Sequence, residues 1–171
     1  MTTATSAMVL IGDFQSGTAI LAGLVGAVAM LAVIYIGMGS GMTSMNLLRT
    51  LGTMVAPTAS NAAIYGIGLA MHLMAGAGAG LVHAGLLHAV DPGSDGAAAL
   101  YGVLFGGVHG VLVAFSLPMM LTMMHPLIQS GEMPAPGVAM TGLGKMTPVG
   151  IIMAHIVFGV VAGVIYVALA G

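Results

Sequence analysis

Residues 62–87 read AAIYGIGLAMHLMAGAGAGLVHAGLL and contain no Asp, Glu, Lys or Arg. A helix needs about 20 consecutive apolar residues to cross the hydrocarbon core of a bilayer, so this segment is long enough to span one. Its apolar character is continuous and rich in Ala, Leu, Met and Gly, whereas the strands of a membrane barrel alternate over about 10 residues. The segment therefore predicts a transmembrane helix.

The composition of the whole 171-residue chain indicates the same class of protein. Hydrophobic residues make up 59% and charged residues 4%, with a mean hydropathy of +1.15, which cannot cover a soluble domain with polar surface. Three further apolar stretches, 18–38, 97–124 and 148–170, resemble the first. The charged residues lie between the stretches: Asp13, Arg49, Asp91, Asp95, Glu132 and Lys145. We expect an all-α integral membrane protein with four transmembrane helices in a single domain, residues 1–171.

The distribution of basic residues predicts an orientation in the membrane. Arg49 and Lys145 fall in the first and third loops, whereas the second loop and the N-terminal tail hold only Asp. Because basic loops stay in the cytoplasm, both termini are expected outside it. The net charge is −2 and no basic patch is present, so the sequence does not favour nucleic acid as a partner.

Local signals predict where the elements between and within the spans begin and end. Residues 42–55 carry polar side chains on one helical side and apolar ones mostly on the other, which predicts a short helix in the membrane interface. Ser60 or Asn61 is expected to cap the second span, and Asp95 the third. Pro118 is expected to interrupt the third span.

One phrase, His-x-x-x-Gly-x-x-x-Gly, occurs twice in the spans. It comprises His72, Gly76 and Gly80 in the second span, and His155, Gly159 and Gly163 in the fourth. The first and third spans match more loosely, with Gly23 against Gly102 and Ala27 against Gly106. These matches predict two tandem helical hairpins, 18–90 and 97–171, that share one membrane orientation. A Gly-Ala-Val-rich composition could produce similar pairs by chance.

Glycines spaced four residues apart lie on one face of a helix and form a groove. Such grooves let helix backbones approach closely, which is a main source of helix association in lipid. Beside a histidine, the same groove could leave room for a flat cofactor. The spacing does not separate the two interpretations.

Histidines near the middle of the spans form a candidate site. Counting along the helices places His72 and His109 close to the bilayer centre and His155 within about two turns of them. Met30 occupies the matching position in the first span. One side chain from each helix is thus expected at a layer near the midplane, where an unpaired polar group costs several kcal/mol.

Several explanations for the histidine layer remain open, including one without any cofactor. Neutral histidines could simply bond to polar groups on neighbouring helices. Haem b could be held by His72 and His155 as axial ligands, with Gly76 and Gly159 beside the ring. A proton relay through the same histidines is a further possibility.

Copper is another explanation, because imidazole and thioether ligands suit this metal. The candidate set is His72, His109, His155 and Met30. The chain has seventeen methionines, which in bundle cores also serve as flexible apolar filler.

Two methionine motifs add a resemblance to this candidate. Met38-x-x-x-Met42 and Met119-x-x-x-Met123 resemble in part the Met-x-x-x-Met element of eukaryotic copper uptake transporters. Those transporters have three spans and form trimers, so their function does not carry over to a chain with four.

No motif for hydrolysis or group transfer is present, and no carboxylate lies within a span to act as a base. The layout of a Gly-Ala-Met hairpin followed by a His-x-x-x-Gly span resembles small multi-pass prokaryotic membrane proteins classed as domains of unknown function. That resemblance implies a membrane location and this architecture only, and we expect the membrane to be a prokaryotic cytoplasmic membrane. We expect a non-catalytic subunit or accessory, in contact with lipid and with other membrane subunits or further copies of itself. A small transporter is an alternative, weakened by the lack of intramembrane carboxylates.

Overall fold

The computed structural model describes residues 12–170, and all the regular structure in this range is helical. Four helices are long and apolar enough to cross a membrane: α1 (Ser16–Gly39), α3 (Asn61–Val90), α4 (Asp95–Met124) and α6 (Thr147–Ala170). The short helix α2 (Leu47–Val55) follows α1, while α5 (Pro126–Gln129) and the 3-10 helix η1 (Val138–Leu143) follow α4. The four predicted spans and the short helix after the first are confirmed.

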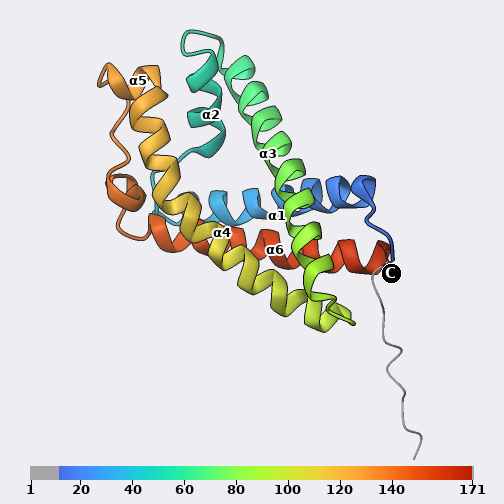
Figure 1. Ribbon diagram of the computed structural model, residues 1–171. Coiled ribbons are helices and arrows are strands. Elements are labelled where there is room, and N and C mark those ends of the chain that lie inside the picture. The colour runs from blue at the N-terminus through green and yellow to red at the C-terminus, as the bar shows by residue number, and fades with distance from the viewer. Residues whose placement is uncertain (1–11, 171) are drawn as a thin grey trace, which may run out of the picture.

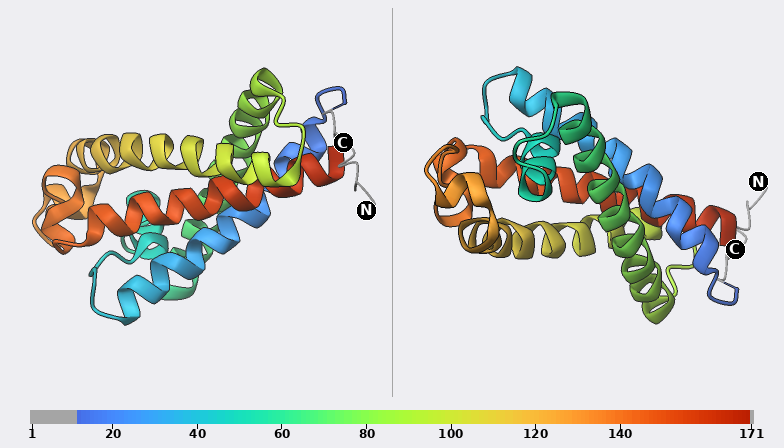
Figure 2. Two further views of the ribbon diagram at one scale, coloured as in Figure 1. Left: turned by 90° about the horizontal axis from the view of Figure 1, so that it is seen from below. Right: turned by 90° about the horizontal axis from the view of Figure 1, so that it is seen from above.

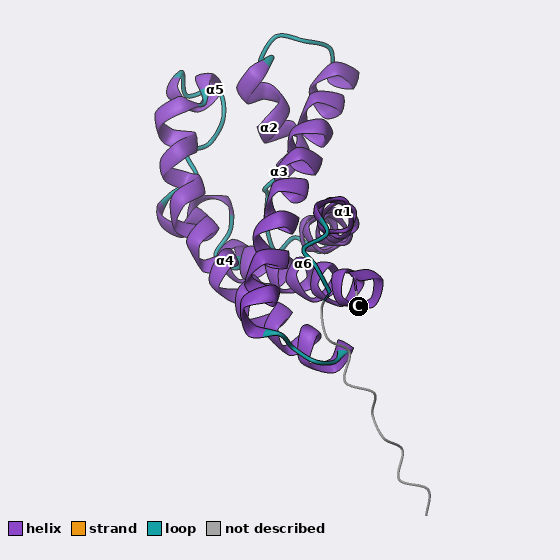
Figure 3. Cartoon of the chain, turned by 45° about the vertical axis from the view of Figure 1, so that its right-hand side comes forward, coloured by secondary structure: helices purple, strands orange, loops and turns teal. Residues whose placement is uncertain are grey.

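The long helices are arranged around a central pair. α1 and α6 pack against each other, α3 packs on α1, and α4 packs on α6 (Figure 1). α3 and α4 diverge from the turn that joins them, with α2 between their far ends (Figure 3). The start of α1, the end of α6 and this turn share one end of the molecule (Figure 2). There the Tyr166 hydroxyl lies 2.7 Å from Nε2 of His88.

Glycine allows α1 and α3 to cross with their backbones in contact. A Cβ atom at Gly23 would collide with the carbonyl oxygen of Gly76, and one at Gly80 would collide with that of Ala19. This crossing therefore needs residues without side chains, and the close backbone contact supplies the packing that the hydrophobic effect does not provide in lipid.

The crossing of α4 and α6 has the same pattern of contacts. A Cβ atom at Gly102 would meet the carbonyl oxygen of Gly159, and one at Gly163 would lie 3.2 Å from that of Ala98. The α1–α3 pair and the α4–α6 pair are thus held by the same kind of backbone contact.

Two helix ends differ from the predictions, and one predicted interruption is absent. α2 begins at residue 47 rather than 42, because the Asn46 side chain accepts a hydrogen bond from its first turn. Ser60 caps α3 as expected. Ser94, not Asp95, caps α4, since Asp95 already lies within the helix. α4 also continues through Pro118, which spans tolerate when nearby groups satisfy the freed backbone.

Candidate functional site

A cavity of about 340 Å³ lies between the diverging helices α3 and α4. Its walls include side chains of α1, α2, α3, α4 and α6. The four residues predicted to share a midplane layer all line it: Met30, His72, His109 and His155. Each of the four long helices therefore contributes one of these side chains to a single space.

The two glycines predicted beside a haem lie in different surroundings. Gly76 lines the cavity, but its missing side chain also makes room for Ala27 of α1. Gly159 is not among the lining residues, and a Cβ atom there would collide with the carbonyl oxygen of Gly102. Helix packing thus accounts for the absence of a side chain at both positions.

His72 and His155 each have one ring nitrogen fixed by the backbone. Nε2 of His72 lies 3.0 Å from the carbonyl oxygen of Ala27, and Nδ1 of His155 lies 2.8 Å from that of Ile151. A carbonyl oxygen can only accept, so these two nitrogens carry the hydrogen. In the neutral rings the other nitrogens, Nδ1 of His72 and Nε2 of His155, therefore present lone pairs.

His109 lies at the centre of the histidine group. Its ring centroid is 4.7 Å from that of His155 and 5.6 Å from that of His83. Its Nδ1 atom is buried and has no hydrogen-bond partner. His83, which was not predicted as a site residue, lines a second cavity of about 510 Å³ that also reaches His109. Imidazoles thus connect two adjoining spaces between α3 and α4.

Methionines supply the other donor atoms of the 340 Å³ cavity. Five thioethers line it: Met30, Met45, Met54, Met71 and Met120. The predicted metal set contained Met30 alone. Met45 lies before α2, Met54 on α2 and Met120 near the end of α4, while Met71 is next to His72 on α3, and no shared spacing links these four. No carboxylate, hydroxyl or amide side chain is found among the described residues that line the cavity.

Within residues 12–170, no three His, Cys, Asp or Glu side chains are grouped so that they could hold a metal ion. A metal site with three or more side-chain ligands in this cavity would therefore have to include thioether sulfur. Imidazole nitrogen and thioether sulfur are the only side-chain donors that its described walls offer.

Comparisons of the chain with protein-family models, with curated proteins and with solved structures found no match. The four apolar helices are those of an integral membrane protein in contact with the lipid bilayer.

Proposed function

We propose that this chain is a non-catalytic membrane protein that binds a soft monovalent metal ion, Cu(I), in the cavity between α3 and α4. The observation that carries the proposal is the donor set of three imidazoles and five thioethers without oxygen side chains. Thioethers select Cu(I) and imidazoles accept copper, whereas Mg²⁺, Ca²⁺ and Mn²⁺ favour carboxylate and carbonyl oxygen.

The hydrogen bonds of the histidines support a metal ligand role. Imidazoles that bind metals usually donate their other N–H group to a carbonyl or carboxylate, which fixes the tautomer and the ring orientation. His72 and His155 both do so, to Ala27 and Ile151 respectively. His109 brings a third imidazole to the same cavity.

Haem b held by His72 and His155 is less well supported. That arrangement uses Gly76 and Gly159 to seat the ring, but both glycines face neighbouring helices at backbone crossings. Copper requires no such slot, so the metal ion is the preferred occupant of the cavity.

We infer that the two hairpins, 18–90 and 97–171, arose by duplication. The matching glycine contacts at the two crossings support this, because Gly23 with Gly76 corresponds to Gly102 with Gly159. We further propose that the protein works as a subunit or accessory of a membrane assembly, beside partner subunits or copies of itself, rather than as a transporter.

The experiment is metal loading of protein purified in mild detergent. Cu(I) is added anaerobically with a weak competing chelator, and bound copper and iron are then measured per chain together with an absorption spectrum. The double variant Met30→Leu with Met71→Leu removes two cavity thioethers at nearly constant volume. The matched control is Met74→Leu with Met153→Leu, because these side chains are 75% and 49% exposed and do not line the cavity.

We expect retained copper in the natural protein and the control, and loss of the cavity ion in the Met30/Met71 variant. Iron with a Soret band would identify haem instead. Protein that retains no copper, or equal retention in all three proteins, would contradict the copper site.

A further inference from the structure

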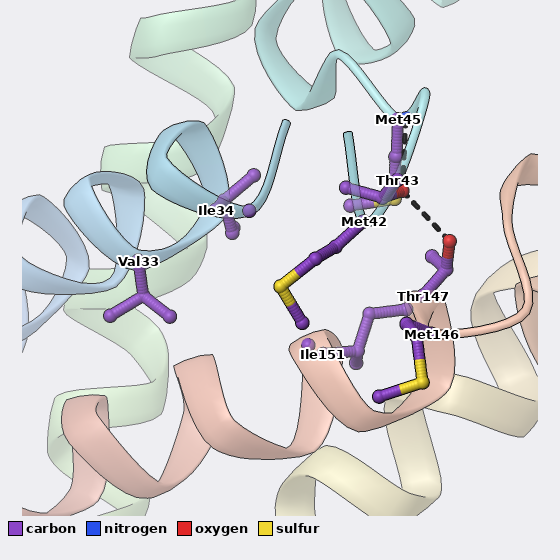
Figure 4. Close-up of a pocket in the computed structure, with 10 residues that line it drawn as sticks. Val33, Ile34, Met42, Thr43, Met45, Met146, Thr147 and Ile151 are labelled. Carbon is purple, nitrogen blue, oxygen red and sulfur yellow. Dashed lines mark hydrogen bonds between the residues drawn. The ribbon is translucent and has the colours of Figure 1, made fainter. Parts of the chain in front are cut away.

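We propose that Met42, Met45 and Met146 form a second soft-metal site, through which Cu(I) passes between the membrane surface and the central cavity. This inference rests on the proposed function of that cavity. The three methionines line a small pocket of about 30 Å³ between the segment after α1 and the start of α6 (Figure 4).

Like the central cavity, the pocket combines thioether sulfur with mostly apolar walls. Its other described lining residues are apolar or glycine, except for Thr43 and Thr147. The Thr147 hydroxyl donates to the Thr43 hydroxyl across 2.8 Å, so these two oxygens already bond each other. A water needs roughly 10–15 Å³ of such space, so the pocket has room for a single small ion. The thioethers are thus its uncommitted side-chain donors.

The pocket is held together by bonds between distant parts of the chain. Besides the Thr43–Thr147 hydrogen bond, the backbone N–H group of Ser44 donates to the carbonyl oxygen of Leu143 across 2.7 Å. These bonds fix the segment that carries Met42 and Met45 against the segment that carries Met146. The fold therefore holds the three methionines around one pocket, and their flexible side chains would turn the sulfur atoms toward an ion.

The exposure of the three methionines falls from the surface toward the central cavity, as a route for an ion requires. Met42 and Met146 are 42% and 45% exposed, whereas Met45 is 5% exposed. Met45 lines both the small pocket and the central cavity, as do Ile34 and Ile151. An ion taken up by the two outer thioethers can therefore reach the cavity by exchange at Met45, without leaving sulfur ligands.

The test uses Ag(I), a soft monovalent ion that does not change oxidation state, as the probe. Three double variants of the full chain are compared with the natural protein: Met42→Leu with Met146→Leu, Met30→Leu with Met71→Leu, and the control Met74→Leu with Met153→Leu. Bound silver per chain is measured after gel filtration, and the filling of the sites is followed by stopped-flow competition with a coloured chelator. The elution profile checks folding, and single Met146→Leu replaces the first variant if that variant aggregates.

We expect about two ions per natural chain and about one in each of the first two variants, with slower filling of the cavity when Met42 and Met146 are replaced. The second site would be overturned, and the cavity site supported, by one bound ion per natural chain that the Met42/Met146 variant also binds at the natural rate. Binding lost only in the Met42/Met146 variant would overturn the cavity site instead. No silver in the natural protein would overturn both.

Discussion

At the scale of single residues, His109 is the histidine of the cavity wall with a buried ring nitrogen that lacks a partner. Its buried Nδ1 atom has no hydrogen bond, although leaving a polar group unpaired in a buried place costs about 1–3 kcal/mol. His72 and His155, in contrast, are each paired with a backbone carbonyl. We therefore expect this unpaired nitrogen to cost the metal-free protein stability, and a ligand role would account for the place of His109 on the cavity wall.

Replacing His109 with leucine separates a ligand from a structural residue. We expect His109→Leu to raise the unfolding free energy of the metal-free protein by about 1 kcal/mol, because it removes an unsatisfied polar atom. The same variant should lose the stabilisation that Cu(I) gives the natural protein. SDS-induced unfolding with and without Cu(I) measures both effects. A less stable variant that is still stabilised by Cu(I) would contradict the ligand role.

The sequence could predict part of this site because depth in a membrane follows from position along a helix. Counting from the span ends placed His72 and His109 near the centre and His155 within about two turns, the repeat alignment added Met30, and all four line the cavity. It could not find Met45, which lies outside any span. Its place at the cavity depends on how the 40–46 segment folds back against the end of η1 and the first residue of α6.

At the scale of elements, the glycines of α3 explain why its path is fixed. Gly80 lies against the backbone of α1, whereas Gly78, on another side of the same helix, has nothing near the position of a Cβ atom. Both residues are glycines of the same helix, so they provide a matched pair for testing the contact with α1.

Alanine at these two positions should have different effects on stability. We expect Gly80→Ala to lower the unfolding free energy by about 1–3 kcal/mol, because the carbonyl of Ala19 cannot move aside. Gly78→Ala should be neutral or stabilising by about 0.5–1 kcal/mol, since alanine favours a helix over glycine. SDS titration of both variants checks the difference, and equal effects would show that the crossing does not depend on Gly80.

The short helix α2 lies at one end of the central cavity, where it packs on α3 and is bonded to the residue that ends α4. Leu47, Leu51 and Met54 of α2 line the cavity. Nε2 of the fully buried His125, at the end of α4, donates to the carbonyl oxygen of Thr50 across 3.0 Å. The amphipathic pattern predicted this helix, but nothing in the sequence linked it to His125.

Removing the His125 anchor should loosen α2 before the spans. We expect His125→Ala to lower the unfolding free energy by about 2–5 kcal/mol, from the cavity left behind and the lost hydrogen bond. Hydrogen exchange should speed up in α2 and remain slow in the middle of α6. Unchanged exchange in α2 would mean that its contacts with α3 are sufficient to hold it.

At the scale of the whole molecule, the sequence identified the spans but not how they are arranged. The four helices follow from apolar length alone. The divergence of α3 and α4 does not, because it depends on which glycine face meets which helix. Gly23 and Gly102 direct α3 and α4 onto opposite members of the central pair. Because α3 packs on α1 and α4 packs on α6, a space remains between α3 and α4, and the cavity lies there.

The orientation in the membrane can be tested because the natural chain contains no cysteine. Gly96→Cys, beside the turn between α3 and α4, and Ser130→Cys, after α5, each introduce a single thiol at an exposed position. With Arg49 and Lys145 on the cytoplasmic side, a membrane-impermeant maleimide should label Gly96→Cys in intact cells. Ser130→Cys should react only after the membrane is opened. The reverse pattern would place both termini in the cytoplasm.

The central claim is that imidazole and thioether side chains bind Cu(I) inside the bilayer. X-ray absorption at the copper edge, on the Cu(I)-loaded natural protein and the Met42/Met146 variant, tests it most directly. We predict a Cu(I) edge with both sulfur and imidazole scattering, and this signal should persist in the variant, where the cavity holds the ion. Oxygen ligands alone, or copper that is removed by the weak chelator, would contradict the account.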